Sequence, residues 1–166
     1  LKAVIPGGSS CPVLTADEID LPMEFDALKA AGTMAGSGGL IVFDESTCMV
    51  RALARITKFY AEESCGQCTP CREGTAWMEA IVEKIEHGHG TAADVEKLEQ
   101  IANSIGGNTI CALGDAASMP VQSFLKKFKP EFLRHAEQRC CPFGDHGWGL
   151  TQAPRDAVAG PVRYAR

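Results

Sequence analysis

Apolar residues from position 46 onward recur every three or four residues, which is the spacing of amphipathic helices. Such segments cover residues 46–62, 73–86, 91–105 and the stretch from about 115 onward. Their apolar stripes contain Met49, Leu53, Ile56 and Tyr60; Trp77, Ile81 and Ile85; Val95, Leu98, Ile101 and Ile105; and Val121, Phe124, Leu125 and Phe128. The pattern predicts four helices whose apolar faces, Trp77 included, pack together as a small four-helix bundle.

Punctuating residues mark where these helices begin and end. Ser46 or Thr47 is a suitable cap for the first helix, and Thr91 with Asp94 forms a capping-box pattern for the third. Glycines at 106–107 end the third helix. In the fourth helix we expect an interruption at Pro120, and a last short turn that starts at Pro130.

The first 45 residues show strand patterns instead. Residues 2–5 and the apolar run 40–45 predict strands, the second one buried, and residues 25–31 predict a short helix. Gly36 and Gly38 begin a G-x-G pattern, but Ile41 stands where a dinucleotide-binding loop needs its third glycine. The predicted class is therefore α+β, mostly α, without a nucleotide site in this region.

Composition narrows the function. An apolar content of 45% is enough for a core, and a net charge of −5 argues against nucleic acid as a partner. No apolar run approaches the roughly 18 residues of a membrane span. Several cysteines without a secretory signal indicate a reducing compartment, so disulfides are not expected. Because the sequence starts with Leu1 rather than Met, we expect it to be a piece of a longer chain.

The spacing of the cysteines indicates a site for a metal cofactor. Cys65, Cys68 and Cys71 form a C-x2-C-x2-C run, and Cys111 lies in a later turn. Three neighbouring thiolates and one distant thiolate are the ligand pattern of a [4Fe–4S] cluster. Residues 72–110 separate the third cysteine from the fourth, and a helical hairpin of that length would return the chain to its starting point.

The residues inside the run suit such a loop. Gly66 permits backbone angles that other residues avoid, and Pro70 is expected to stop a helix from running through the loop. Cys71 is expected just before a helix, whose positive end would face an anionic cluster. Arg72 adds a positive charge beside it.

Zinc is the alternative occupant of this quartet. Structural zinc sites usually combine two C-x2-C pairs, so the pattern of three plus one favours a cluster over an ion that merely staples a docking domain. We expect the other thiols to take no part: Cys11 as a bystander, Cys48 as a small buried residue, and adjacent Cys140 and Cys141 as unsuited to one cluster. His135 is expected to be structural or exposed.

Several motifs resemble a known family. ESCGQCTPCREG (63–74), NTICALGDAASMPV (108–121) and FLKKFKPEF (124–132) resemble, in order, the C-terminal part of the NADH-binding, FMN-containing flavoprotein subunit of respiratory complex I, the NADH:quinone oxidoreductase. KAVIPGGSSCPVLT and GSGGLIVFDEST extend the resemblance, which spans about residues 2 to 137. Related subunits occur in NAD-reducing hydrogenases and NAD-linked formate dehydrogenases.

The resemblance implies an electron-carrier module of an oxidoreductase. In the family, NADH reduces FMN, and a [4Fe–4S] cluster takes electrons from the flavin singly and passes them to the next cluster toward quinone. Cys65, Cys68, Cys71 and Cys111 match the cluster motifs and are the expected cofactor and metal ligands, with no catalytic residue expected. The flavin- and nicotinamide-binding domain has no counterpart in this sequence, so this segment alone should not oxidise NADH.

The resemblance also implies a domain order. Residues 1–45 would be the later part of a β-grasp, soluble-ligand-binding domain, with its missing strands upstream, and residues 46–137 the iron–sulfur four-helix bundle. Residues 138–166, rich in Gly and Pro, read as an extended tail in which His146 and Trp148 anchor on a neighbour. The expected partners are other iron–sulfur subunits of a complex I-type peripheral arm, in the cytoplasm or on the matrix side of a respiratory membrane, without direct membrane insertion.

Overall fold

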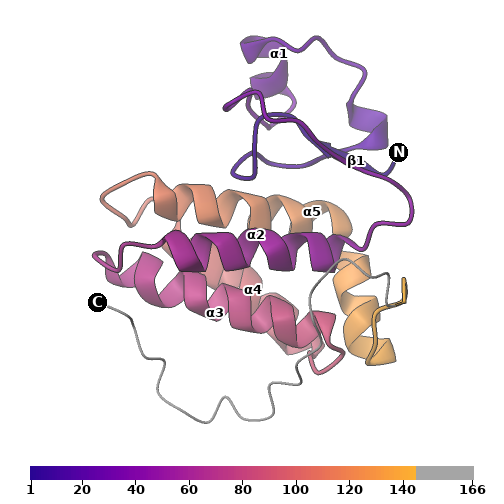
Figure 1. Ribbon diagram of the computed structural model, residues 1–166, viewed down its shortest axis with the longest axis vertical. Coiled ribbons are helices and arrows are strands. Elements are labelled where there is room, and N and C mark those ends of the chain that lie inside the picture. Colours follow the sequence, from indigo (N-terminus) through magenta and orange to yellow (C-terminus); the bar gives the residue numbers. More distant parts are fainter. Residues whose placement is uncertain (145–166) are drawn as a thin grey trace.

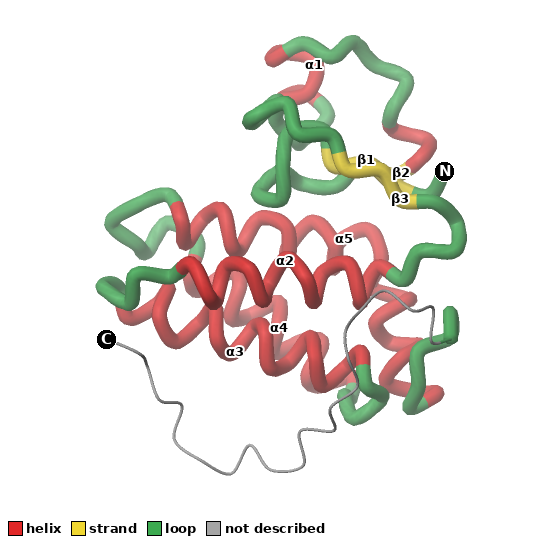
Figure 2. Tube along the Cα trace, viewed as in Figure 1, coloured by secondary structure: helices red, strands yellow, loops and turns green. Residues whose placement is uncertain are grey.

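The computed structural model describes residues 1–144, which form a small sheet and a larger group of helices (Figures 1 and 2). The strands are β1 (Ala3–Ile5), β2 (Leu14–Thr15) and β3 (Ile41–Phe43), and the 3-10 helix η1 (Ala16–Glu18) and α1 (Phe25–Ala30) lie between β2 and β3. The long helices are α2 (Met49–Glu63), α3 (Thr69–Glu86), α4 (Ala92–Ile105) and α5 (Leu113–Gln138). The predicted α+β class, mostly helical, is confirmed for these residues. The anchors expected at His146 and Trp148 lie outside them.

The sheet has β1 at its centre, in the order β2-β1-β3 with antiparallel neighbours. Both predicted strands are found, while β2 was not predicted because its two residues are too short to show a period. The expectation that the strand at 40–45 is buried was wrong. Val42 is 59% exposed and Phe43 is buried, because successive side chains point to opposite faces and only the Phe43 face meets a helix.

The long helices pack around a shared interior. Helix α2 contacts α3 and α5, and α4 contacts the same two helices. Helices α3 and α4 form the predicted hairpin, which brings the chain back to the end of α2 that lies near residue 63 (Figure 1). Among the described helices, none is both long enough and apolar enough to cross a membrane.

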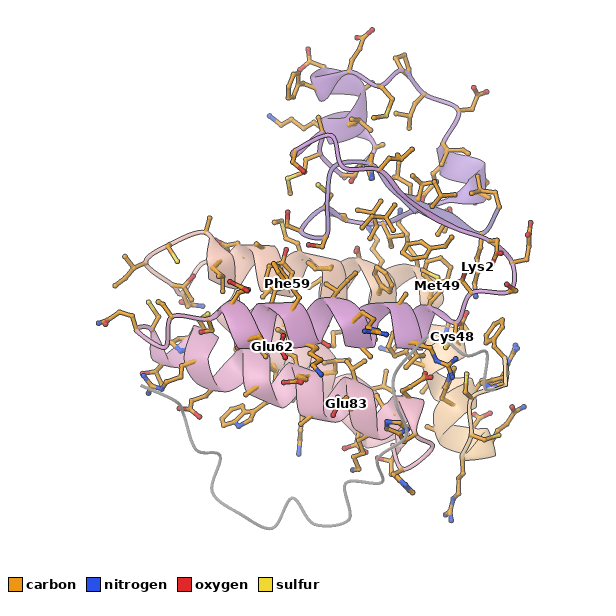
Figure 3. All side chains as sticks on the ribbon, in the orientation of Figure 1. Lys2, Cys48, Met49, Phe59, Glu62 and Glu83 are labelled. Atoms are coloured by element: carbon orange, nitrogen blue, oxygen red, sulfur yellow. The ribbon has the colours of Figure 1, made fainter. Side chains whose placement is uncertain are left out.

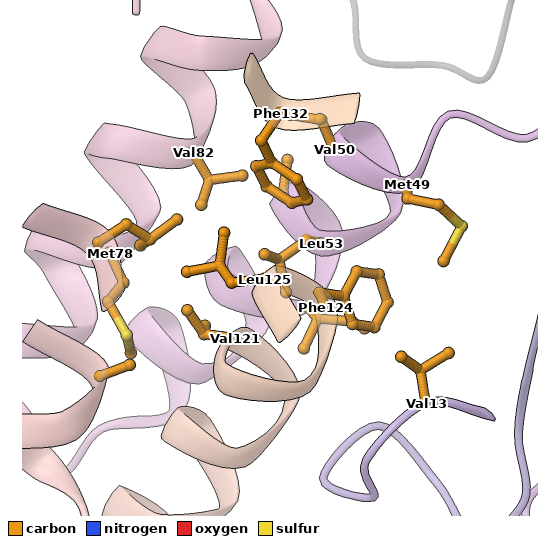
Figure 4. Close-up of a cluster of buried hydrophobic side chains, with 14 of the residues drawn as sticks. Val13, Met49, Val50, Leu53, Met78, Val82, Val121, Phe124, Leu125 and Phe132 are labelled. Carbon is orange, nitrogen blue, oxygen red and sulfur yellow. The ribbon is translucent and has the colours of Figure 1, made fainter. Parts of the chain in front are cut away.

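Buried side chains from several helices fill this interior (Figure 4). Leu53 of α2, Val82 of α3, and Leu125 of α5 are almost completely buried. The sheet contributes to the same apolar cluster, since Phe43 packs edge-to-face on Phe124 with ring centroids 6.3 Å apart. One continuous core therefore joins both parts of the described chain.

Three details of the helices differ from expectation. The cap of α2 is Cys48, whose sulfur accepts the Arg51 N–H at 3.3 Å, so Ser46 and Thr47 are not caps. Helix α5 runs through Pro120 and departs from helical angles at Phe128 (φ −121°, ψ 15°). The departure lies two residues before Pro130, because a proline ring clashes with the preceding helical turn. Helix α5 then continues to Gln138, where a short turn was expected.

Trp77 is also placed differently, since 56% of its surface is exposed. The buried stripe of α3 runs through Met78, Val82 and Ile85 instead. Adjacent helical positions differ by about 100°, so a stripe centred on Met78 turns its neighbour toward solvent. The predicted capping box of α4 is confirmed: Thr91 accepts the Asp94 N–H, and the Asp94 carboxylate accepts the Thr91 N–H at 2.8 Å.

Candidate metal centre

The first three cysteines of the predicted quartet lie where α2 ends and α3 begins. Cys65 follows α2, Cys68 is the N-cap of α3, and Cys71 lies in the first turn of α3. Gly66 has a φ of +76°, which confirms that this turn needs glycine. Pro70 was expected to stop a helix, but it occupies the first turn of α3, where its missing N–H costs nothing.

Side chains close this loop on itself. Arg72 donates from Nη1 to the Gly66 carbonyl at 2.9 Å, and its Nε lies 2.9 Å from a Glu73 carboxylate oxygen. The Ser64 hydroxyl lies 3.3 Å from the Cys71 sulfur and accepts the Gly66 N–H at 3.4 Å. These contacts hold Cys65, Cys68 and Cys71 on one tight turn, with a guanidinium beside them.

The fourth cysteine lies in the loop between α4 and α5. Figure 1 shows this loop at the same end of the helices as the loop between α2 and α3. The Ile110 N–H donates to the Cys68 sulfur at 3.4 Å, so the residue next to Cys111 touches the first loop directly. Asp115 accepts the Gly107 N–H at 2.7 Å and closes the second loop. The hairpin thus brings the segment that holds Cys111 to the other three cysteines, as the sequence predicted.

This arrangement suits an anionic cofactor held by sulfur. Helices α3 and α5 both begin beside the cysteines, and helix N-termini carry partial positive charge. The four thiols are free in this structure: Cys71 is buried, Cys68 is half-buried, and Cys65 and Cys111 are exposed. Four thiolates and a backbone N–H directed at a sulfur match the ligands and the hydrogen bonding of a protein-bound iron–sulfur cluster. The donor set therefore fits the group.

The other described cysteines lie elsewhere. Cys11 is buried in the sheet part of the chain, and Cys140 is exposed after α5. Cys48 lies at the far end of α2 from Cys65 (Figure 3). It is buried beside Glu86, His135 and Cys141. Sequence reasoning missed this second group. Its members are spread from position 48 to 141 and form no short motif, so only the fold brings them together.

Comparisons with known proteins agree with this geometry. The family model for the NADH-ubiquinone oxidoreductase-F iron-sulfur binding region matches residues 51–135. An F subunit of the NADH-quinone oxidoreductase of Rhizobium meliloti is 52% identical over 86% of this chain, and the F subunit of the Mycobacterium bovis enzyme is 51% identical over 86%. The chain spans about a third of the length of these relatives, 34% and 32% respectively.

A solved structure shares the fold. The crystal structure of NAD+-reducing [NiFe]-hydrogenase in the H2-reduced state superposes with a TM-score of 0.70 and 29% identity, over 85% of this chain and 23% of the hydrogenase chain. The matched residues 51–135 contain the three clustered cysteines and Cys111. This chain therefore belongs to the family of the NADH-ubiquinone oxidoreductase-F iron-sulfur binding region.

Proposed function

We propose that this chain is the one-electron carrier module of an NADH:quinone oxidoreductase. Cys65, Cys68, Cys71 and Cys111 hold a [4Fe–4S] cluster at one end of a four-helix bundle that helices α2 to α5 form. When bound, the cluster supplies reversible one-electron transfer between a flavin and the next iron–sulfur centre. The observation that carries the proposal is the contact of Ile110 N–H with the Cys68 sulfur, which joins the two cysteine loops.

The surroundings of the quartet support this role. Arg72 and the N-termini of α3 and α5 stabilise negative charge, which favours the reduced state of a cluster held by four thiolates. Cys65 and Cys111 are exposed, and Ile110 is 87% exposed. The quartet therefore lies at the surface, where a redox partner has access to it.

The rest of the enzyme lies beyond this chain. We propose that the flavin and NADH bind in an upstream domain of the complete protein, since the chain spans about a third of its relatives (34% and 32%). Residues 1–45 are the later part of a β-grasp domain, and residues 46–137 are the cluster bundle. The partners are other iron–sulfur subunits of a peripheral arm at the cytoplasmic or matrix face of a respiratory membrane.

Anaerobic purification and reconstitution of the 166-residue chain tests the proposal. We expect a brown protein with about four irons per chain, visible absorption that dithionite bleaches, and no NADH oxidation. The Cys111→Ser variant should lose most of the iron or yield a smaller cluster. Cys11→Ser is the matched control, because Cys11 is buried in the sheet part away from both loops, and it should keep its iron.

Two results would contradict the proposal. One is a colourless protein in which the quartet holds zinc that Cys111→Ser releases, as in a stapled docking domain. The other is a Cys111→Ser variant with the same iron content and spectrum as the unmodified chain. Far-UV circular dichroism of each variant separates loss of the cofactor from loss of the fold.

A further inference from the structure

Four potential metal ligands meet at the end of the helices opposite the quartet. They are Cys48 at the start of α2, Glu86 at the end of α3, His135 near the end of α5, and Cys141 just beyond it. One ligand atom from each residue lies within 4.8 Å of the others. Cys48, Glu86 and His135 are buried, and Cys141 is half-buried. Two sulfurs, an imidazole nitrogen and a carboxylate oxygen are typical zinc ligands.

We propose that Cys48, Glu86, His135 and Cys141 form a structural zinc site, separate from the iron–sulfur quartet. Helix α2 has 15 residues, which at 1.5 Å per residue separates the two sites by about 22 Å. Figure 3 shows Cys48 at the end of α2 that is remote from the loop holding Cys65. The zinc would fasten the end of α5 and the segment after it to α2 and α3.

Distances between the ligand atoms match a tetrahedral ion. The Cys48 sulfur lies 3.2 Å from His135 Nε2 and 3.4 Å from Glu86 Oε2, and the last two atoms are 3.4 Å apart. With zinc bonds of about 2.3 Å to sulfur and about 2.0–2.1 Å to nitrogen or oxygen, the ligand atoms of a tetrahedron are about 3.3–3.6 Å apart, except that the two sulfurs are about 3.8 Å apart. Small movements would therefore make room for the ion.

The neighbours of these ligands already orient them. His135 Nδ1 lies 2.8 Å from the Glu131 carbonyl, which can only accept, so Nδ1 is the donor to that carbonyl and Nε2 is the ring nitrogen that faces the group. Arg51 donates from Nε to Glu86 Oε1 at 2.6 Å and leaves Oε2 directed at the group. The Arg51 N–H donates to the Cys48 sulfur at 3.3 Å. Such hydrogen bonds to the ligands are usual around protein-bound zinc.

Charge and ligand type favour zinc over other occupants. The three negative charges of two thiolates and one carboxylate are neutralised by a divalent ion together with the Arg51 guanidinium. Thiolate and imidazole ligands suit zinc, whereas magnesium and calcium prefer oxygen. A cubane cluster takes cysteine ligands that stand farther apart than these touching side chains.

Metal analysis of the full chain tests the site. The chain is produced with a cleavable tag in zinc-supplemented medium, and zinc and iron are measured separately by mass spectrometry. We expect about one zinc per chain at a four-ligand site, besides the iron. The Cys48→Ser/Cys141→Ser double variant should lose that zinc and keep its iron, and Cys65→Ser should do the reverse. Serine is itself a good N-cap, so position 48 still caps α2.

A matched control uses the other two thiols. The Cys11→Ser/Cys140→Ser double variant removes the same number of cysteines and should keep the zinc. Cobalt substitution of the unmodified chain adds an independent readout, with thiolate-to-cobalt charge-transfer bands and tetrahedral visible bands expected. The proposal is overturned if the folded, unmodified chain binds neither zinc nor cobalt outside the quartet, if the Cys48/Cys141 variant keeps its zinc, or if mass spectrometry finds these two cysteines joined as a disulfide.

Discussion

At the scale of single residues, Gly66 shows how backbone geometry serves the quartet. Its φ of +76° is close to the +77° of Gly32, which lies after α1. A Cβ at Gly32 would meet nothing within 4 Å, and a Cβ at Gly66 would meet only the Arg72 side chain at 3.7 Å. A substitution should therefore cause the same backbone strain at both positions, but only Gly66 lies in the cysteine loop.

We predict that Gly66→Ala and Gly32→Ala each destabilise the chain by about 1–2 kcal/mol, the usual cost of a left-handed non-glycine residue. Only Gly66→Ala should also speed the loss of iron to a chelator, because it disturbs the turn between Cys65 and Cys68. Denaturant unfolding measures the first effect, and the decay of visible absorption measures the second. Equal rates of iron loss in both variants would show that the backbone geometry of the cysteine loop does not affect how well the chain retains iron.

At the scale of elements, the N-terminus of α4 differs from those of the other long helices, because it has a complete capping box. Asp94 accepts hydrogen bonds from Thr91 and from Lys84 at 2.8–2.9 Å. Partial burial would raise the pKa of Asp94, but the hydrogen bonds from Lys84 and Thr91 outweigh burial and hold the pKa below its ordinary value. The Asp94 carboxylate thus caps the first turn of α4 and also connects α4 to α3 through Lys84.

This lowered pKa gives a pH dependence with a definite sign. A carboxyl whose pKa is lower in the folded state contributes stability above its unfolded pKa of about 3.9, and the contribution is lost as pH falls through the folded value. Asp94→Asn should cost about 0.5–2 kcal/mol at pH 7 and flatten the stability curve below about pH 4. Unfolding curves at several pH values measure this.

Lys84→Gln supplies the partner test for the same contact. This variant should lose part of the pH dependence of stability and keep the capping hydrogen bonds from Thr91. An Asp94→Asn variant with the acid sensitivity of the unmodified chain would contradict the assignment. A Lys84→Gln variant as destabilised as Asp94→Asn would show that the ion pair, not the cap, dominates.

At the scale of the whole molecule, Glu131 joins the sheet part to the helices. Its carboxylate accepts from Lys2 at 2.7 Å and from the Met49 N–H at 2.6 Å, and the Lys2–Glu131 pair is mostly shielded from water. Phe43 and Phe124 continue the connection through the core. We therefore expect the sheet and the helices to unfold in one cooperative transition.

We predict that Glu131→Ala destabilises the chain by about 2–3 kcal/mol, because it removes charge-assisted hydrogen bonds and leaves the shielded Lys2 ammonium without its carboxylate partner, with the Thr47 carbonyl at 2.7 Å still accepting from it. Glu62→Ala is the control, since the ion pair of Glu62 with Lys58 is long, at 4.0 Å, and exposed, and this change should cost less than about 0.5 kcal/mol. Denaturant unfolding followed by circular dichroism and by tryptophan fluorescence checks both. Separate transitions for the two probes in the unmodified chain would rule out a single cooperative unit.

The sequence alone predicted the helices and the run of Cys65, Cys68 and Cys71, because both follow from local spacing. Stripes such as Val95, Leu98 and Ile105 identify α4 without reference to other elements, and Cys65, Cys68 and Cys71 are close together in the chain. The return of Cys111 was also predictable, since a hairpin of two helices must bring the chain back.

Tertiary packing decided the rest. It set which face of α3 is buried, so that Met78 rather than Trp77 faces the core. It exposed Val42 on an edge strand and extended α5 past Pro130. Above all, it gathered Cys48, Glu86, His135 and Cys141 at the end of the helices opposite the quartet. Residues that are so far apart in the chain come together only through the packing of α2, α3 and α5, so local sequence spacing does not predict their contact.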